Sequence, residues 1–393
     1  MTLTRDELKS KIKRFVDQTS GELIELSLRI HDEPELGHQE FKACADLTQF
    51  LSRHGMNVTT GSAGLPTAFR ATFTGGKAKP VVAFLGEYDA LPQIGHACGH
   101  NIIGASAACA GAALASLGCD LPGSAWVLGT PAEETSGGKV TMVQQGLFSD
   151  VDAVMMMHPT TGESRMGGTS TATHGFTIRY KGRPAHAAGA PQKGINALDA
   201  ATIFLTSVAL LRQHVPEEVR MHGIITKGGD AANIIPELTE IRYLARAKSR
   251  GTLDAVVERV KACIQAGAIA TGCEVEVQDR RGYEATKHNK VMARVLSDNY
   301  AAAGISVNPE PRDGKGSTDL GNVSQVVPQA CAYPAIAPDT VAGHSRELCE
   351  AAGSDEGHRV LIASAKAMAW AAVDLMLAPE ILEQAWEELR KSQ

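Results

Sequence analysis

The pattern of apolar and polar positions divides the chain into stretches typical of different secondary structures. Residues 5–30 alternate charged and apolar residues at helical spacing, which predicts a helix. Apolar runs bounded by Gly or Pro predict buried strands at residues 81–85, 125–128 and 153–157, and an Ala-rich stretch at 101–117 predicts a buried helix between the first two. Strands that alternate with helices predict an α/β fold, with a mostly parallel sheet that has helices on both faces.

The pattern changes after about residue 171. Residues 176–180 alternate apolar and polar side chains, as in a strand of a sheet with one solvated face. The following segments predict a helix at 197–211, strands at 221–226 and 241–247, a helix at 253–268 and a strand at 273–277. This βαββαβ order makes a compact α+β unit, and the earlier pattern resumes near residue 288. We therefore expect one domain formed by residues 1–171 and 288–393, interrupted by an inserted domain at 172–287.

Length, charge and cysteine content narrow the class of protein. A chain of 393 residues exceeds the roughly 250–300 residues of a single core, so two domains are expected. A net charge of −6 and the lack of a Lys/Arg block argue against nucleic-acid binding. No signal peptide and no uninterrupted apolar stretch of about 18 residues is evident, so we expect no membrane association. The eight cysteines show no disulfide spacing, which indicates reduced thiols and a cytoplasmic protein.

Several residues that commonly bind metals follow the predicted strands. Cys98 and His100 lie two residues apart on one turn after the first strand, with Asp89 just before them. The other candidates are the adjacent Glu133 and Glu134 after the second strand, His158 directly after the third, and His344 near the end of the chain. Carboxyl ends of parallel strands meet at one edge of a sheet, so these loops should gather there. Thiolate, imidazole and carboxylate ligands bind Zn²⁺ or a similar metal and can leave a position for water.

Other interpretations of these residues exist. A lone Cys or His is usually a core or surface residue, and Glu133 and Glu134 could occupy the first turn of a helix, where acids favour the dipole. Cys98 could be the nucleophile of a thiol hydrolase with His100 as its base. Residues two apart on a turn rarely aim at one substrate atom, however, and the acids would have no task. A non-catalytic binding protein would be free to lose an acid such as Glu133, which is present. A metal-dependent hydrolase is therefore favoured.

Six separated motifs carry a resemblance to a known family. They are residues 30–37, 87–101, 131–134, 158–159, 182–187 and 343–345. In this order, and with the inserted domain in its place, the chain resembles the metallopeptidase family of aminoacylases, carboxypeptidase-G-type enzymes and plant auxin-conjugate amidohydrolases. Residues 87–101 and 316–324 are most similar to β-alanyl-lysine-type dipeptidases and aminobenzoyl-glutamate hydrolases. The resemblance implies hydrolysis of an amide bond in a dipeptide or N-acyl amino acid, with aminobenzoyl-glutamate as an alternative substrate.

The resemblance also implies a metal centre and a general base. It implies two divalent ions per subunit, Zn²⁺ or Mn²⁺ with Co²⁺ possible, bound by Cys98, His100, Glu134, His158 and His344. Glu133 would be the base that deprotonates a shared water for attack on the amide carbon. Much of the wider family has a His where this chain has Glu87, so we count neither Glu87 nor Asp89 as a ligand. We expect Asp89 to orient a ligand instead.

In the inserted domain the resemblance implies functions that spacing alone does not indicate. From spacing, His186 would be a surface loop residue. The resemblance implies that it stabilises the oxyanion in the active site of a partner subunit, and that Asn233 binds substrate. We expect Asp319 to bind the far end of the substrate. The inserted domain would then serve as a lid and as the contact between two subunits of a homodimer.

Overall fold

The computed structural model describes residues 3–314 and 316–392, and the chain forms two compact units. The first unit comprises Met1–Thr169, Thr286–Asp313 and Asn322–Gln393, and the second comprises Ser170–Ala285 and Gly314–Gly321. The segment Gly314–Gly321, which we expected in the first domain, belongs by its contacts to the second unit. The backbone N–H of Thr171 donates to the carbonyl of Gly316 over 2.9 Å, and its hydroxyl lies 2.8 Å from that of Ser317, which holds this segment in the second unit.

The first unit is built on a seven-stranded sheet in the order β1-β2-β4-β3-β5-β12-β7. Its four central strands, β4, β3, β5 and β12, run parallel, and the outer strands pair antiparallel. The strands are β1 (Asn57–Thr60), β2 (Phe69–Thr74), β3 (Val81–Gly86), β4 (Ser124–Gly129), β5 (Ala153–Met157), β7 (Arg165–Met166) and β12 (Gln329–Tyr333), with a separate pair β6 (Thr160–Thr161) and β13 (Ala335–Ala337). Every residue of β3 and β5 is buried, as expected for central strands of a parallel sheet. The predicted α/β fold is confirmed.

Helices pack on these strands and on one another. They are α1 (Arg5–Asp32), α2 (Phe41–Arg53), α3 (His100–Ala115), α4 (Gly138–Gln144), α7 (Lys290–Ala302), α9 (Arg346–Ala352), α10 (Asp355–Leu377) and α11 (Pro379–Lys391), while the short α8 (Leu320–Val323) spans the unit boundary. All of α3 is buried, because its small side chains let α1, α10 and β3 approach closely. Among the described residues, α10 is long and apolar enough to cross a membrane, but 83% of its most apolar stretch is buried inside the protein, as in a core helix.

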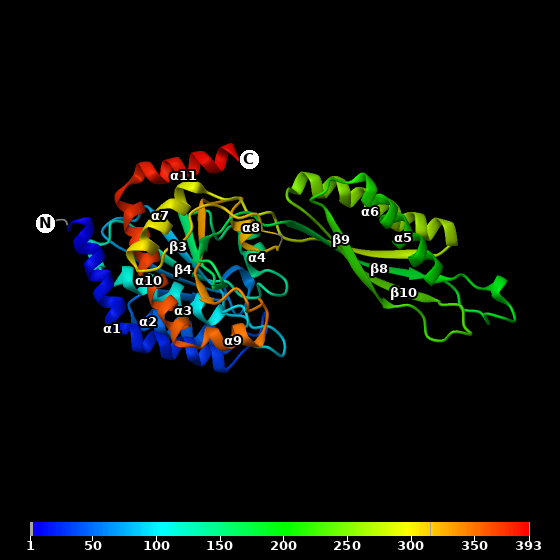
Figure 1. The fold of residues 1–393 in the computed structure, drawn as a ribbon, viewed down its shortest axis with the longest axis horizontal. Coiled ribbons are helices and arrows are strands. Elements are labelled where there is room, and N and C mark those ends of the chain that lie inside the picture. Colours follow the sequence, from blue (N-terminus) through cyan, green and yellow to red (C-terminus); the bar gives the residue numbers. More distant parts are fainter. Residues whose placement is uncertain (1–2, 315, 393) are drawn as a thin grey trace. The chain divides into compact units, whose positions relative to one another are not determined.

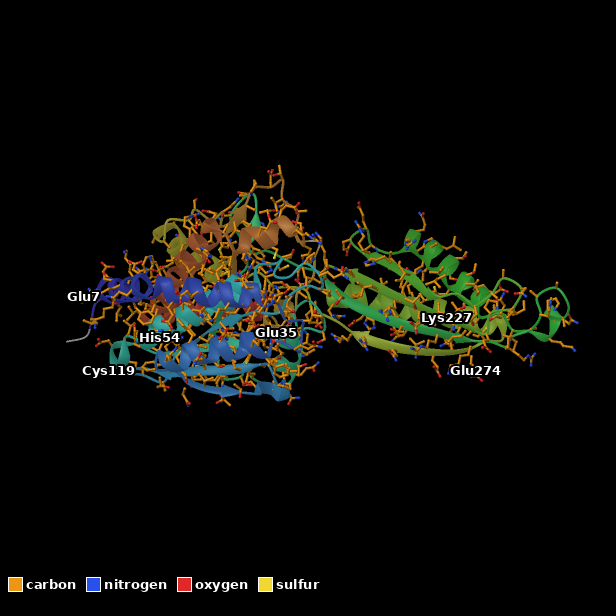
Figure 2. All side chains as sticks on the ribbon, turned by 90° about the horizontal axis from the view of Figure 1, so that it is seen from below. Glu7, Glu35, His54, Cys119, Lys227 and Glu274 are labelled. Carbon is orange, nitrogen blue, oxygen red and sulfur yellow. The ribbon has the colours of Figure 1, made fainter. Side chains whose placement is uncertain are left out.

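The second unit is a four-stranded antiparallel sheet with two helices on one face (Figure 1). In chain order it contains β8 (Ala172–Lys181), α5 (Ala197–Leu211), β9 (Arg220–Lys227), β10 (Leu238–Ala247), α6 (Arg250–Thr271) and β11 (Glu274–Arg281), the predicted βαββαβ order. Side chains such as Ile178, Phe204 and Val260 form its core between sheet and helices. The edge strands are β9 and β11, on which Figure 2 labels Lys227 and Glu274.

Candidate metal centre

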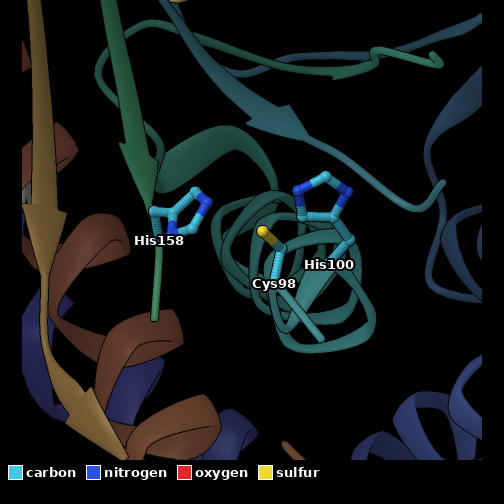
Figure 3. Close-up of side chains that lie close together, drawn as sticks. All are labelled: Cys98, His100 and His158. Atoms are coloured by element: carbon cyan, nitrogen blue, oxygen red, sulfur yellow. The ribbon is translucent and has the colours of Figure 1, made fainter. Parts of the chain in front are cut away.

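Cys98 and His100 lie on the tight turn that begins α3 (Figure 3). Gly99, the N-cap residue between them, has a φ of 72°, and a Cβ at this position would lie 2.7 Å from the Cγ of Pro159. Only glycine accommodates both the left-handed backbone and this close approach. The turn therefore packs directly on the residue after His158, which follows the end of β5, and Figure 3 shows the three side chains grouped together.

Asp89 contacts two of the segments that carry candidate ligands. The Nδ1 of His100 lies 2.8 Å from the backbone carbonyl of Asp89 and 3.0 Å from its Oδ1, so Nδ1 is the donor. The other carboxylate oxygen accepts the backbone N–H of Glu134 over 2.9 Å. With Nδ1 engaged, His100 presents Nε2 to the cluster. These contacts are the ones that the expected positioning role of Asp89 requires.

The adjacent acids lie on a loop after β4 rather than in a helix. Helix α4 begins only at Gly138, so the alternative of a helical first turn is wrong for Glu133 and Glu134. Ala132, directly before them, has a φ of 62° and donates its N–H to the buried carboxylate of Glu40 over 2.8 Å. A non-glycine residue in this conformation needs such support, and Ala132 is the residue that directly precedes both acids.

His344 approaches the same carboxylate from the other end of the chain. Its φ is 57°, again in the left-handed region, and its side chain is 58% exposed. The Oε1 of Glu134 lies 3.8 Å from the Nε2 of His344 and 3.9 Å from the Nε2 of His100. Glu134 is therefore placed between the two imidazoles.

The structure brings all six predicted metal-site residues into overlapping groups whose donor atoms lie within 4.8 Å of one another. The groups are Cys98, His100 and His158; Cys98, Glu134 and His344; and His100, Glu133 and Glu134. Three buried atoms at this place, the Oε2 of Glu87, the Nε2 of His100 and the Oε1 of Glu134, have no hydrogen-bond partner in the described structure. Buried polar atoms are rarely left so, and a cation would satisfy all three. The donors present thus fit a metal centre.

The electrostatics of the cluster favour a metal ligand over a free thiol nucleophile. Burial raises the pKa of the Cys98 thiol to about 12, so the thiolate requires a nearby cation. Burial would lower the pKa of His100, but the Asp89 carboxylate raises it well above its usual range. Burial lowers the pKa of His158, which keeps that imidazole neutral and able to donate a lone pair. A thiol hydrolase based on Cys98 is therefore disfavoured.

The candidates of the inserted domain lie together in the second unit. His186 pairs with Ile234 in an isolated antiparallel bridge, and the N–H of Ala187 donates to the carbonyl of Asn233 over 3.0 Å. The Nδ1 of His186 accepts the backbone N–H groups of Ala188 at 3.2 Å and Gly189 at 3.0 Å. The ring proton must therefore be on Nε2, so the imidazole presents an N–H donor.

Asp319 is fully buried, and the substrate contact that we expected of it stays a prediction. Glu40, which supports Ala132, and Lys139, which pairs with Glu87, were not predicted. No local pattern marks either residue, because their partners are distant in sequence. Glu87 was considered and set aside, and the structure places it at the cluster.

Comparison with known proteins agrees with this geometry. The model of peptidase family M20/M25/M40 matches residues 83–366. The chain is 38% identical to the Xaa-Arg dipeptidase of Mus musculus over 98% of this chain and 92% of that protein. It is 29% identical to one of the subunits of the p-aminobenzoyl-glutamate hydrolase of Escherichia coli over 96% and 95% of the two chains. A dinuclear metal-binding M20 peptidase from Bacillus subtilis has the same fold, with a TM-score of 0.70 at 20% identity, covering 92% of this chain and 99% of that one.

The family match covers most of the chain, and the Xaa-Arg dipeptidase aligns along nearly its whole length. Both agree with the resemblance drawn from the six motifs, so the predicted family and its reaction class are confirmed. This protein belongs to peptidase family M20/M25/M40 and is a metal-dependent amidohydrolase.

Proposed function

We propose that this protein is a two-metal dipeptidase that prefers a basic C-terminal residue. One observation supports the metal centre. Sulfur, nitrogen and oxygen atoms that can bind a metal lie close together, and three buried polar atoms at the same place have no hydrogen-bond partner in the described structure. Similarity to the Xaa-Arg dipeptidase, higher than that to the aminobenzoyl-glutamate hydrolase, supports the substrate class. Hydrolysis of aminobenzoyl-glutamate or of another N-acyl amino acid is the second candidate, since that hydrolase also aligns along nearly the whole chain.

The five proposed ligands fall into two sets that share one residue. One ion would be held by Cys98, His100 and His158, and the other by Cys98, Glu134 and His344. The thiolate favours Zn²⁺, and Mn²⁺ and Co²⁺ are the alternatives to test. When bound, such ions supply Lewis-acid chemistry, making water more acidic and polarising the amide carbonyl.

Glu133 is the proposed general base. Its carboxyl group lies within 4.8 Å of donors from His100 and Glu134, so it can take a proton from a water bound at the cluster and deliver it to the leaving nitrogen. Glu134 contacts both imidazoles and is assigned to metal binding instead. Both acids follow Ala132 on one loop, and their carboxylates lie within 4.8 Å of each other.

The substrate assignment is tested with a panel of amides. Dipeptides ending in Arg or Lys, dipeptides ending in Glu, N-acetyl amino acids and aminobenzoyl-glutamate are each assayed with Zn²⁺, Mn²⁺ and Co²⁺. We expect the highest kcat/KM for the basic dipeptides. A higher value for aminobenzoyl-glutamate would select the second candidate, and hydrolysis of none of these amides under any metal would overturn the proposed substrate class.

The roles of the two acids are tested by paired substitutions. Glu133→Gln keeps the shape but cannot accept a proton, so turnover should fall by about 10²–10⁴-fold with metal content retained. Glu134→Gln should instead lose metal. If Glu133→Gln loses metal while Glu134→Gln retains it, the two assignments are reversed.

We also propose a homodimer formed by the second units. Strand β9 is an unpaired edge of its sheet, and Ile224 and Ile225 on it are 65% and 42% exposed. Exposed apolar edges are usually covered, and a second copy related by a two-fold axis is the commonest solution. Ile224→Lys should convert the dimer to a monomer, measured by sedimentation. A monomeric wild-type protein would refute the proposal.

His186 is proposed to serve the active site of the partner subunit, with Asn233 beside it binding substrate. The Nε2–H of His186 would donate to the oxyanion, and losing one such donor costs about 10²–10³-fold in turnover. His186→Ala should therefore be folded, dimeric and metal-loaded but nearly inactive. Mixing it with Glu133→Gln should restore activity, because a heterodimer contains one site with both groups. Subunits that exchange without any recovery would rule out sharing.

A further inference from the structure

A buried ion pair lies beside the proposed metal centre. Glu87, which follows β3, is 1% exposed, and Lys139 in the first turn of α4 is fully buried. The Nζ of Lys139 lies 2.5 Å from the Oε1 of Glu87. Burying a lysine and a glutamate is unfavourable unless their interaction repays the lost hydration. Lys139 thus contacts one oxygen of the Glu87 carboxylate, and the other oxygen, Oε2, is directed elsewhere.

That second oxygen faces a ligand atom of the cluster. The Oε2 of Glu87 lies 3.4 Å from the Nε2 of His100, and neither buried atom has a hydrogen-bond partner among the described residues. When Nε2 carries no proton, its lone pair and a carboxylate oxygen repel each other at this distance unless a cation lies between them. Two ligands each about 2.1 Å from one tetrahedral ion are about 3.4 Å apart. The observed separation is therefore the one expected of two ligands of the same metal ion.

The ion pair explains how an added carboxylate can be tolerated. Lys139 fixes the rotation of the Glu87 carboxylate through one oxygen and leaves the other directed at His100. Its positive charge also balances the charge of Glu87, so the centre gains an oxygen donor without gaining net negative charge. A simple structural ion pair would instead be expected to satisfy both oxygens, since each is buried.

We propose that Glu87 is a further ligand of the metal ion bound by Cys98, His100 and His158, and that Lys139 holds it in position. The proposal rests on the metal centre of the proposed function. It adds a sixth protein ligand, and it reverses our exclusion of Glu87 from the ligand set. Lys139 is a positioning residue in this arrangement, because it acts through Glu87.

The test is metal affinity rather than activity. The metal-free protein is titrated with Zn²⁺ in competition with a chromophoric chelator. Glu87→Gln should lower the affinity for one of the ions by at least about tenfold, since even groups that only orient a ligand typically contribute about 10–100-fold. The Co²⁺-loaded variant should also show an altered visible spectrum. Asp374→Asn is the matched control, because Asp374 is a buried carboxylate that binds Arg5 and Lys9 in the same unit.

A double variant separates metal binding from structure. Glu87→Gln alone removes the buried carboxylate that binds Lys139 and is expected to lower stability, whereas Glu87→Gln with Lys139→Met removes both charges. If the pair is only structural, the double variant should recover wild-type stability and wild-type metal affinity together. The proposal predicts recovered stability with affinity still at least about tenfold weaker. Wild-type affinity in the double variant overturns the proposal, whereas a wild-type protein that binds no metal overturns the metal centre itself.

Discussion

Cys98 is the one proposed ligand that belongs to the ligand sets of both metal ions. Its replacement should therefore affect the binding of both ions, whereas replacement of a ligand in one set should affect only one. Binding of an ion stabilises the folded state by about 2.7 kcal/mol when its free concentration is about 100 times the Kd. At such concentrations two independent sites would raise the free energy of unfolding of the wild-type protein by about 5 kcal/mol. His158→Ala should retain one ion and about half of this stabilisation. Cys98→Ala should lose both ions and nearly all of it.

The assay combines ion counting with unfolding. Elemental analysis of the desalted proteins gives the number of ions per chain, and urea unfolding with and without added Zn²⁺ gives the stabilisation. Cys119→Ala is the matched control, because Cys119 is an exposed cysteine outside the cluster (Figure 2) and its removal should change neither quantity. Two ions in every variant would refute the ligand assignment. One ion in both Cys98→Ala and His158→Ala would show that Cys98 serves only one set.

Two further substitutions test the surroundings of the cluster. Asp89→Asn should weaken metal binding by about 10–100-fold, measured by chelator competition, because Asp89 orients both His100 and Glu134, and unchanged affinity would contradict that role. His96 is buried, and burial lowers its pKa to about 3, so below about pH 6.5 the unfolded chain takes up a proton that the native state does not. Metal-free stability should therefore fall with pH by up to about 1.4 kcal/mol per unit between about pH 6.5 and 3. When the pH is lowered from about 6.5 to 5, the free energy of unfolding in urea should fall by about 2 kcal/mol less for His96→Leu than for the wild-type protein. An equal fall in both proteins would contradict this interpretation.

The sequence predicts four of the candidate ligands because each follows the end of a predicted strand. β3, β4 and β5 lie side by side and run parallel, so their carboxyl ends meet, and the residues that follow them must share one edge. The turn at Cys98 and His100 needs only three adjacent residues. Local pattern and parallel topology together are thus sufficient to bring Cys98, His100, Glu134 and His158 into one place.

The supports of these ligands are not predictable in the same way. Glu40 reaches the N–H of Ala132 across 92 positions, and Lys139 reaches Glu87 across 52. Glu40 and Lys139 are common residue types with polar neighbours in the sequence. Only the structure shows that both are fully buried, so that other groups of the protein must bind their charged ends in place of water. The place of the segment Gly314–Gly321 is hard to predict for the same reason, because Thr171, which joins it to the second unit by hydrogen bonds to Gly316 and Ser317, is distant in sequence.

The second unit shows how antiparallel pairing places chemistry differently from a parallel sheet. Residue spacing alone does not indicate a function for His186, and the bridge from His186 to Ile234 joins the loop after β8 to the loop before β10. Those two strands are neighbours in the sheet, with Lys181 paired to Leu238, so the segments that extend beyond this pair emerge together. The same ladder that builds the domain therefore brings together the two loop segments that carry His186 and Asn233. A shift of this pairing by one residue would turn the side chains of one strand to the other face of the sheet, so the register of β8 and β10 also fixes which residues of the two loops face each other.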